Sequence, residues 1–163
     1  MRSKKAYFAA GCFWGVEYHF EKLDGVIRAI SGYMGGVTPN PSYKEVCTGL
    51  TGHLEVVCVE YDAEALPFES LVKHFFEIHD FTQTNGQGPD IGSQYLSAVF
   101  YNDEAEKKCV KEIIALLETK GFHVATMLIS THNTPFFEAE EYHQDYYFKH
   151  NKTPYCHTLR KIF

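Results

Sequence analysis

The apolar positions at the start of the chain follow two different periods. Residues 5–10 form a short apolar run, which predicts a buried strand. From Phe13 to Leu23 the apolar residues recur at helical spacing, which predicts a helix. The Asp24-Gly25 pair is a strong turn signal and ends this helix. The chain therefore begins with a strand, a sharp turn and a helix.

Two further strands and a second amphipathic helix are predicted next. Residues 26–33 and 53–62 both have the composition of strands, and the second of these segments is the clearest strand of the sequence. Pro67 is suited to the first turn of a helix, and an apolar stripe follows it. The stripe consists of Phe68, Leu71, Val72, Phe75 and Phe76.

The second half of the chain predicts two strands and two helices. The strands are expected at 95–101 and 124–130, and the last helix near 137–147. Between the strands, Asp103 and Glu106 have the spacing of a helix cap. The predicted buried face of that helix consists of Ala105, Cys109, Ile113, Leu116 and Leu117.

The order strand, helix, strand, strand, helix, strand is typical of a ferredoxin-like sandwich. We therefore expect an α+β fold, a ferredoxin-like α/β sandwich with a βαββαβ core and an additional strand and helix. Two long glycine-rich loops at 34–52 and 82–94 interrupt the pattern, and such loops in a compact domain are usually functional. Residues 1–163 should form a single domain with a mobile C-terminal tail from about residue 148.

The composition excludes several classes of protein. A chain of 163 residues is long enough for one domain with a substantial core. Its net charge of −6 argues against nucleic acid as a partner, because phosphate binding needs a basic face. No apolar run approaches the roughly 18 residues that span a membrane, so we expect no membrane partner. The apolar stretch before Cys12 has only six residues, too few for a signal peptide of the usual roughly 7–15.

The cysteines indicate a reducing compartment. There are five of them, without paired spacing and without a secretion signal, so we expect a cytoplasmic protein with reduced thiols. The chain lacks a CxxC motif, which argues against a structural zinc site despite nine histidines. We therefore expect no metal. We also expect no cofactor and a monomeric protein.

The cysteine with the most chemical potential is Cys12, in the stretch Gly11-Cys12-Phe13-Trp14-Gly15. It falls at a predicted strand-to-helix turn, where unpaired backbone N–H groups and the helix dipole favour a nucleophilic thiolate. The flanking glycines allow the turn and a close approach of substrate. The alternative is a small buried cysteine packed with the two aromatic residues, and the pattern alone leaves both interpretations open.

A second candidate is Glu55, in the clearest predicted strand. Alternation places it on the same face as Val57, Val59 and Tyr61. A lone carboxyl group in an apolar row is poorly solvated, which raises its pKa and retains a proton. Beside a thiolate, such a group would act as a general acid. The alternative is an exposed position at the end of the strand.

Further polar candidates lie in or directly after the two long loops. Tyr43 is in the first loop, Asp90 is in the second, and Tyr95 follows it. Phenols donate hydrogen bonds to a substrate oxygen without adding charge. Each tyrosine could equally be an ordinary packing residue, since the chain has eleven of them.

The remaining cysteines have less certain roles. Cys156 lies in the predicted tail and is a candidate resolving thiol, which would convert an oxidised Cys12 into a disulfide. The alternative is a surface cysteine without a role. We interpret Cys47, Cys58 and Cys109 mainly as structural.

Several motifs occur along nearly the whole chain in the order of a known family. They are GCFWG (11–15), GYMGGVTPNPSYKEVCTGLTGH (32–53), Glu55, HD (79–80), QGPDIGSQY (87–95) and TPFFEAEEYHQDY (134–146). On these residues the chain resembles the A-type peptide methionine sulfoxide reductases. The resemblance implies reduction of methionine sulfoxide, free or in peptides, to methionine. It also implies the S epimer, because A and B enzymes each take one epimer.

The resemblance implies roles for individual residues. Cys12 would be the nucleophile that attacks the sulfoxide sulfur, and Glu55 the acid that protonates the departing oxygen. Tyr43 and Tyr95 would help to hold that oxygen, and Asp90 would support the site.

It also implies a pocket and a route of recycling. Phe13 and Trp14 would line the pocket for the S-methyl group of the substrate. The sulfenic acid left on Cys12 would be resolved by Cys156, and the resulting disulfide would be reduced by thioredoxin. The biological role would be the repair of oxidised proteins.

The sequence departs from the family pattern at three points. Leu96 stands where the family often has arginine, and Pro154 stiffens a tail that is commonly rich in glycine. No cysteine follows Cys156, so a second relay step along the tail is not expected. These departures weaken the resolving role of Cys156 more than any other assignment.

Two other functions stay open from the sequence. A thiol peroxidase would also pass through a sulfenic acid, but would not need aromatic residues beside the thiol. A module that binds oxidised methionine without turnover would not need the thiol at all.

Overall fold

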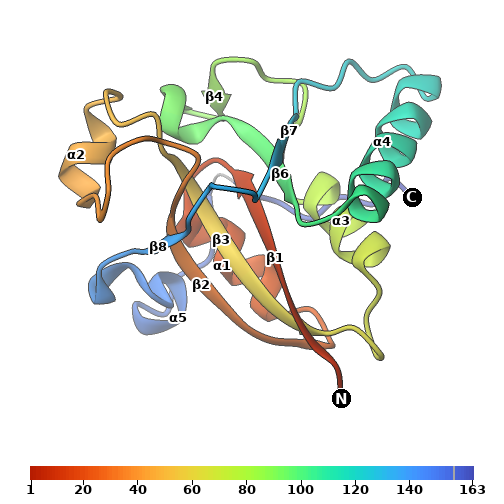
Figure 1. Ribbon diagram of the computed structural model, residues 1–163, viewed down its shortest axis with the longest axis horizontal. Coiled ribbons are helices and arrows are strands. Elements are labelled where there is room, and N and C mark those ends of the chain that lie inside the picture. Colours follow the sequence, from red (N-terminus) through yellow and green to blue (C-terminus); the bar gives the residue numbers. More distant parts are fainter. Residues whose placement is uncertain (156) are drawn as a thin grey trace.

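A six-stranded sheet forms the centre of the computed structural model, which describes residues 1–155 and 157–163 (Figure 1). The strand order is β7-β6-β1-β3-β2-β8, and every neighbouring pair is antiparallel except β6 and β7. The strands are β1 (Ser3–Ala10), β2 (Val26–Met34), β3 (Leu54–Asp62), β6 (Ser97–Tyr101), β7 (Met127–Ser130) and β8 (Phe137–Glu138). Two short strands, β4 (Gly86–Gln87) and β5 (Asp90–Ile91), pair separately in the second long loop.

Three helices cover one face of this sheet, and loops cover the other. The helices are α1 (Phe13–Glu21), α3 (Phe68–Glu77) and α4 (Glu104–Thr119). Their apolar residues share one cluster with Phe8, Val57 and Val99 of the sheet. On the opposite face, Val56 and Phe100 pack with other apolar residues in a smaller cluster. Because both faces of β3 are covered, it is buried along most of its length.

The first half of the chain forms the elements that its apolar pattern predicts. The predicted strands at 5–10, 26–33 and 53–62 correspond to β1, β2 and β3, and the helix after Pro67 is α3. One element was not predicted, the short helix α2 (Tyr43–Cys47) in the first long loop. Ser42 and Glu45 close a capping box there, which satisfies backbone N–H groups that a five-residue helix cannot pair internally.

The predicted buried face of α4 is partly wrong. Ala105 and Leu116 are exposed, whereas Glu106 and Val110 are buried. The Glu106 carboxyl group accepts the N–H of Asn102 at 2.9 Å. A polar side chain therefore occupies the first buried position of the helix. The first two buried positions are shifted by one residue from the predicted ones, whereas Ile113 and Leu117 are buried as predicted.

The predicted boundaries of later elements also change. β6 begins at Ser97, because residues 93–95 form a 3-10 turn. β7 begins at Met127 rather than at 124, since the N–H of Ala125 donates to the carbonyl of Phe81 outside the sheet. The predicted helix at 137–147 is wrong. That segment contains β8, a 3-10 turn at 141–143 and the start of α5 (Tyr146–Lys149).

Contacts with β2 explain why residues 137–147 do not form a helix. The Gln144 side chain accepts the N–H of Ser31 and donates to its carbonyl, both at 2.9 Å. The N–H of Ala139 donates to the same carbonyl at 2.9 Å. These long-range hydrogen bonds replace those of a helix, and helical periodicity in the sequence does not reveal them.

The described residues at the C-terminal end lie against α1 and α3. His157 is buried, and its Nε2–H donates to the carbonyl of Ala10 at 2.5 Å. Its own carbonyl accepts from His19 Nε2 at 3.0 Å. The N–H groups of Ile162 and Phe163 both donate to the Glu77 carboxylate. Cys156 lies outside the described residues.

No helix within residues 1–155 and 157–163 is long and apolar enough to cross a membrane. The fold itself is a mixture of helices and a largely antiparallel sheet.

Candidate active site

The thiol of interest stands at the sharp turn between β1 and α1. Cys12 is the N-cap residue of α1 and is half-buried. Gly11 before it has a φ of +91°, and a Cβ at this position would clash with the side chain of Gln87. Only glycine tolerates both the positive φ and the close approach of the Gln87 side chain. The backbone is thus shaped to present Cys12 at the positive end of the helix.

Glu55 reaches the same helix end from the neighbouring strand β3. Its side chain is 1 % exposed, and Oε1 accepts the N–H of Phe13 at 3.2 Å. This contact satisfies one of the backbone donors that α1 cannot pair internally. The carboxyl group therefore lies next to the residue that follows Cys12.

The Glu55 carboxyl group retains a proton near neutral pH. Burial raises its pKa to about 8, and the charge of Asp90 acts in the same direction, while the N–H of Phe13 opposes both. Within the described part of the chain, its Oε2 has no hydrogen-bond partner. A buried, protonated carboxyl group with one oxygen available is the arrangement required of a general acid.

Two phenols from the long loops adjoin this carboxyl group. Tyr43 on α2 and Tyr95 in the 3-10 turn interact with each other and with Glu55. Burial raises the pKa of both phenols, and the proximity of Glu55 raises it further. Both remain protonated and can donate hydrogen bonds. The structure therefore brings together four sequence candidates, including Asp90, whose charge acts on Glu55.

The two aromatic residues after Cys12 differ in exposure. Phe13 is 1 % exposed and packs against Tyr33, with the ring centroids 5.7 Å apart. Trp14 is half-buried and stacks on Tyr146, with the ring centroids 3.7 Å apart. Its indole N–H donates to His143 Nδ1 at 3.0 Å. Of the two aromatic residues that follow Cys12, Trp14 is thus the partly exposed one, whereas Phe13 belongs to the core.

Two residues near the site were not singled out from the sequence. Glu140 accepts from the hydroxyl of Tyr33 at 2.8 Å and from the N–H of Tyr43 at 2.9 Å. His143 is buried between the rings of Phe13, Tyr43 and Trp14. Both residues lie in the sequence motif at 134–146. The helix predicted for that segment gave no reason to expect either side chain near the site.

The other described cysteines lie apart from this arrangement or disfavour a thiolate. Cys58 is buried in β3, and burial raises its pKa to about 11. Burial also raises the pKa of Cys47, at the end of α2, and of Cys109, in α4. None of the three has the helix-cap position of Cys12, and the candidate partner Cys156 is not among the described residues.

A cysteine at a helix N-terminus, a protonated carboxyl group and two phenols define a thiol enzyme with an internal proton donor. Residues 4–162 match the family model of peptide methionine sulfoxide reductase. The chain belongs to this family.

Relatives and solved structures agree with this assignment. The peptide methionine sulfoxide reductase MsrA of Sulfolobus acidocaldarius is 47 % identical over 152 residues, which cover 93 % of this chain and 85 % of that protein. The crystal structure of Mxr1 from Saccharomyces cerevisiae in reduced form has a TM-score of 0.88 at 37 % identity, covering 98 % and 93 % of the two chains. Mxr1 in complex with Trx2 has a TM-score of 0.66 at 25 % identity, covering 98 % and 91 %.

Proposed function

We propose that Cys12 attacks the sulfur of methionine sulfoxide and that Glu55 supplies the proton to the departing oxygen. The reaction is that of the family: the sulfoxide is reduced to methionine, and the Cys12 thiolate is oxidised to a sulfenic acid that carries the oxygen. The observation that carries the proposal is the buried Glu55 carboxyl group, with a pKa of about 8, bonded to the N–H of the residue after Cys12.

Other residues prepare the substrate for this step. Tyr43 and Tyr95 donate hydrogen bonds to the sulfoxide oxygen as negative charge develops on it. The charge of Asp90 helps to retain the proton of Glu55. Trp14, with Phe13 beneath it, contacts the apolar S-methyl end. The substrate is methionine S-sulfoxide, as expected of an A-type enzyme.

Recycling requires a second thiol and an external reductant. Cys156 attacks the sulfenic acid, water leaves and a disulfide with Cys12 forms. Thioredoxin then reduces this disulfide by thiol–disulfide exchange. The complex of Mxr1 with Trx2, a structural relative of this chain, supports thioredoxin as the partner.

A single-turnover assay tests the chemistry. Fully reduced protein is mixed with excess peptide carrying S-methionine sulfoxide and no reductant, and methionine formed and thiols lost are both counted. We expect about one methionine per chain with loss of two thiols, which peptide mapping assigns to Cys12 and Cys156. Formation of methionine by the Cys12→Ser variant would refute the proposal.

The resolving thiol is tested separately. Cys156→Ser should complete one turnover and then fail to recycle with thioredoxin, while Cys109→Ser serves as the matched control. If Cys156→Ser recycles at the wild-type rate, another thiol resolves the sulfenic acid.

The description of the fold as a ferredoxin-like sandwich is part of the same proposal. The order β6-β1-β3-β2, with antiparallel neighbours and with α1 and α3 as connections, supports a ferredoxin-like core. Elements β7, β8, α4 and α5 are then additions. Four further expectations stay predictions. They are a single catalytic domain over residues 1–163, a monomeric state, a cytoplasmic location and a mobile tail.

A further inference from the structure

Glu140 links two tyrosines from distant parts of the chain. Its Oε1 accepts a hydrogen bond from the hydroxyl of Tyr33 on β2 at 2.8 Å, and its Oε2 accepts one from the N–H of Tyr43 on α2 at 2.9 Å. Both tyrosine rings pack against Phe13, with centroids 5.7 Å and 6.4 Å from its own. One carboxylate therefore uses both of its oxygens to fix the surroundings of the residue that follows Cys12.

The Glu140 carboxyl group is a hydrogen-bond acceptor and not a proton donor. Partial burial acts to raise its pKa, but hydrogen bonds from the Tyr43 N–H, its own N–H and the Tyr33 hydroxyl outweigh burial and lower the pKa below its ordinary value. Glu55 differs, because burial raises its pKa to about 8 and it keeps its proton. Glu140 is therefore suited to holding neighbouring groups and not to transferring a proton.

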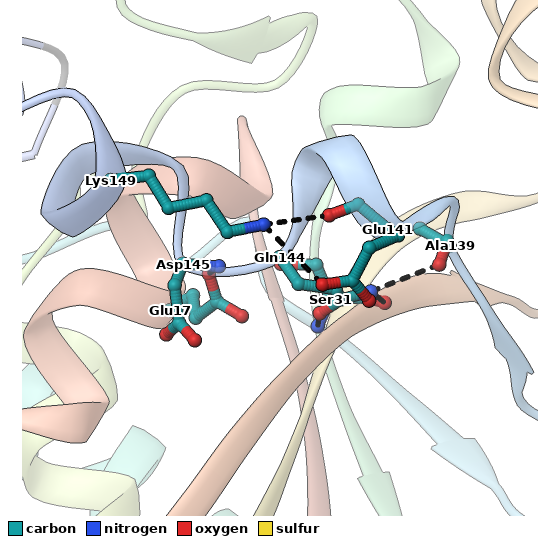
Figure 2. Close-up of polar contacts among 7 residues, drawn as sticks. All are labelled: Glu17, Ser31, Ala139, Glu141, Gln144, Asp145 and Lys149. Carbon is teal, nitrogen blue, oxygen red and sulfur yellow. Dashed lines mark hydrogen bonds and ion pairs between the residues drawn. The ribbon is translucent and has the colours of Figure 1, made fainter.

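The segment that carries Glu140 is itself fixed to the sheet. The Gln144 side chain donates to the carbonyls of Ser31 and Ala139 at 2.9 Å and 3.0 Å (Figure 2). The N–H of Ala139, directly before Glu140, donates to the same Ser31 carbonyl at 2.9 Å. Glu140 therefore extends from a segment that is held against β2.

The helix α2, which begins with Tyr43, depends more on outside contacts. It has five residues, and a helix of this length is not stable by itself. Its capping box, formed by Ser42 and Glu45, is local to the loop. The hydrogen bond between Tyr43 and Glu140 instead joins residues 97 positions apart. It ties the first residue of α2 to the segment held against β2.

We propose that Glu140 is a positioning residue for Tyr43. By holding the N–H of Tyr43, it fixes the first turn of α2 and keeps the phenol beside Tyr95 and Glu55, with which the phenol interacts. Glu140 thus acts through the phenol and not on the substrate. This role rests on the proposed function, in which Tyr43 donates a hydrogen bond to the sulfoxide oxygen.

Single-turnover reduction of methionine sulfoxide tests the role. Glu140→Ala removes both hydrogen bonds and should slow methionine formation by about tenfold. The loss should not exceed that of Tyr43→Phe, because a displaced phenol costs no more than an absent one. Glu140→Gln should keep nearly the wild-type rate, since its amide can accept from the Tyr43 N–H and donate to the Tyr33 hydroxyl.

The matched control is Glu141→Ala, which should have the wild-type rate. Glu141 is exposed, and its carbonyl and carboxylate accept from Lys149 instead (Figure 2). A rate of Glu140→Gln as low as that of Glu140→Ala would overturn the proposal, because the charge and not the position of the carboxyl group would then matter.

A double-mutant cycle separates positioning of Tyr43 from a general structural role. In the Tyr43→Phe background no hydroxyl is left to position, so Glu140→Ala should not slow the reaction further, whereas independent effects would multiply. Further slowing in that background would overturn the proposal. A wild-type rate of Tyr43→Phe would also overturn it. If Glu140→Ala does not fold, Glu140→Asp takes its place, because its shorter side chain cannot span Tyr33 and Tyr43.

Hydrogen–deuterium exchange gives a readout that does not depend on catalysis. Peptides that cover α2 should exchange faster in Glu140→Ala than in wild type, while those that cover α4 should not change. Equal exchange of α2 in the two proteins would refute the anchoring of Tyr43. The proposed function is tested separately, by methionine formation in wild type and its loss in Cys12→Ser.

Discussion

Glu55 of β3 and Glu17 of α1 are two buried glutamates with similar burial and backbone contacts. Each is 1 % exposed and accepts one backbone N–H, from Phe13 at 3.2 Å and from Asp145 at 2.7 Å. In each, Oε2 lacks a hydrogen-bond partner among the described residues. Burial is the main cause that raises both pKa values to about 8.

The neighbours of the two carboxyl groups differ. Glu55 faces the phenols Tyr43 and Tyr95, which keep their own protons and donate hydrogen bonds. Glu17 faces the carboxyl groups of Glu21 and Asp145. Burial therefore determines that both glutamates hold a proton, and their neighbours determine its use. The Glu55 proton, beside donors and a thiol, is the one that we propose is transferred to the substrate, whereas the Glu17 proton lies among other carboxyl groups.

The largest expected effect distinguishes Glu55 from other buried glutamates. Glu55→Gln should slow single-turnover reduction of methionine sulfoxide by about 10²–10⁴-fold, because the amide cannot transfer a proton. The control is Glu106→Gln, since Glu106 is also buried with a raised pKa but lies on α4. Its rate should match wild type. A wild-type rate in Glu55→Gln would remove Glu55 from the role of acid.

The pH dependence of the rate provides the next test. The Glu55 carboxyl group is protonated below its pKa of about 8 and loses the proton above it. The single-turnover rate should therefore fall by about tenfold per pH unit above this pKa. This decrease in rate at high pH should be absent in Glu55→Gln. It should be present in Glu17→Gln, although both carboxyl groups titrate in the same range. Stopped-flow measurement of the rate from roughly pH 6 to pH 10 tests this. A decrease in rate that persists in Glu55→Gln would contradict the assignment of Glu55 as the acid.

A smaller effect is expected from the phenols. Tyr95→Phe should slow single-turnover reduction by about tenfold, because one hydrogen bond to the sulfoxide oxygen is lost while Tyr43 remains. Tyr101→Phe, on β6, is the matched control. If the double variant Tyr43→Phe/Tyr95→Phe is no slower than Tyr95→Phe alone, the two phenols do not share the oxygen.

The smallest effect concerns stability and should be common to both glutamates. Their folded-state pKa of about 8 lies above the ordinary value of 4.5. The stability that each contributes is therefore complete below pH 4.5 and is lost as the pH rises through 8. The Tm should decline over this range, and Glu17→Gln or Glu55→Gln should each reduce the decline by about 5 °C. Thermal unfolding measured from pH 4 to pH 9 tests this, and an unchanged slope in both variants would contradict it.

Local sequence patterns were sufficient to predict where Cys12 and Glu55 lie in the fold, but they left the roles of both residues open, and only the family resemblance implied those roles. Cys12 follows from a glycine-flanked turn between a strand and a helix, and Glu55 from alternation along one strand. Both depend on backbone periodicity and on turns, which are determined by neighbouring residues. The predicted exposed alternative for Glu55 is excluded, because β3 is covered on both faces.

The second half of the site depends on contacts between distant residues. Glu140 meets Tyr33 and Tyr43, which are about 100 positions earlier in the chain. Gln144 likewise binds Ser31 across the sheet. Helical spacing of apolar residues near 137–147 favoured a helix, and tertiary hydrogen bonds overrode that preference. No local pattern reports such pairings.

The close approach of α1 to the C-terminal segment also has an evolutionary consequence. Gly15 faces the imidazole of His157, and a Cβ at position 15 would overlap that ring. Gly15→Ala alone should therefore be tolerated poorly, but less so when position 157 carries a small side chain. We expect the residues at these two positions to change together during divergence. The substitution at position 157 should come first, because a small side chain there makes room for a Cβ at position 15.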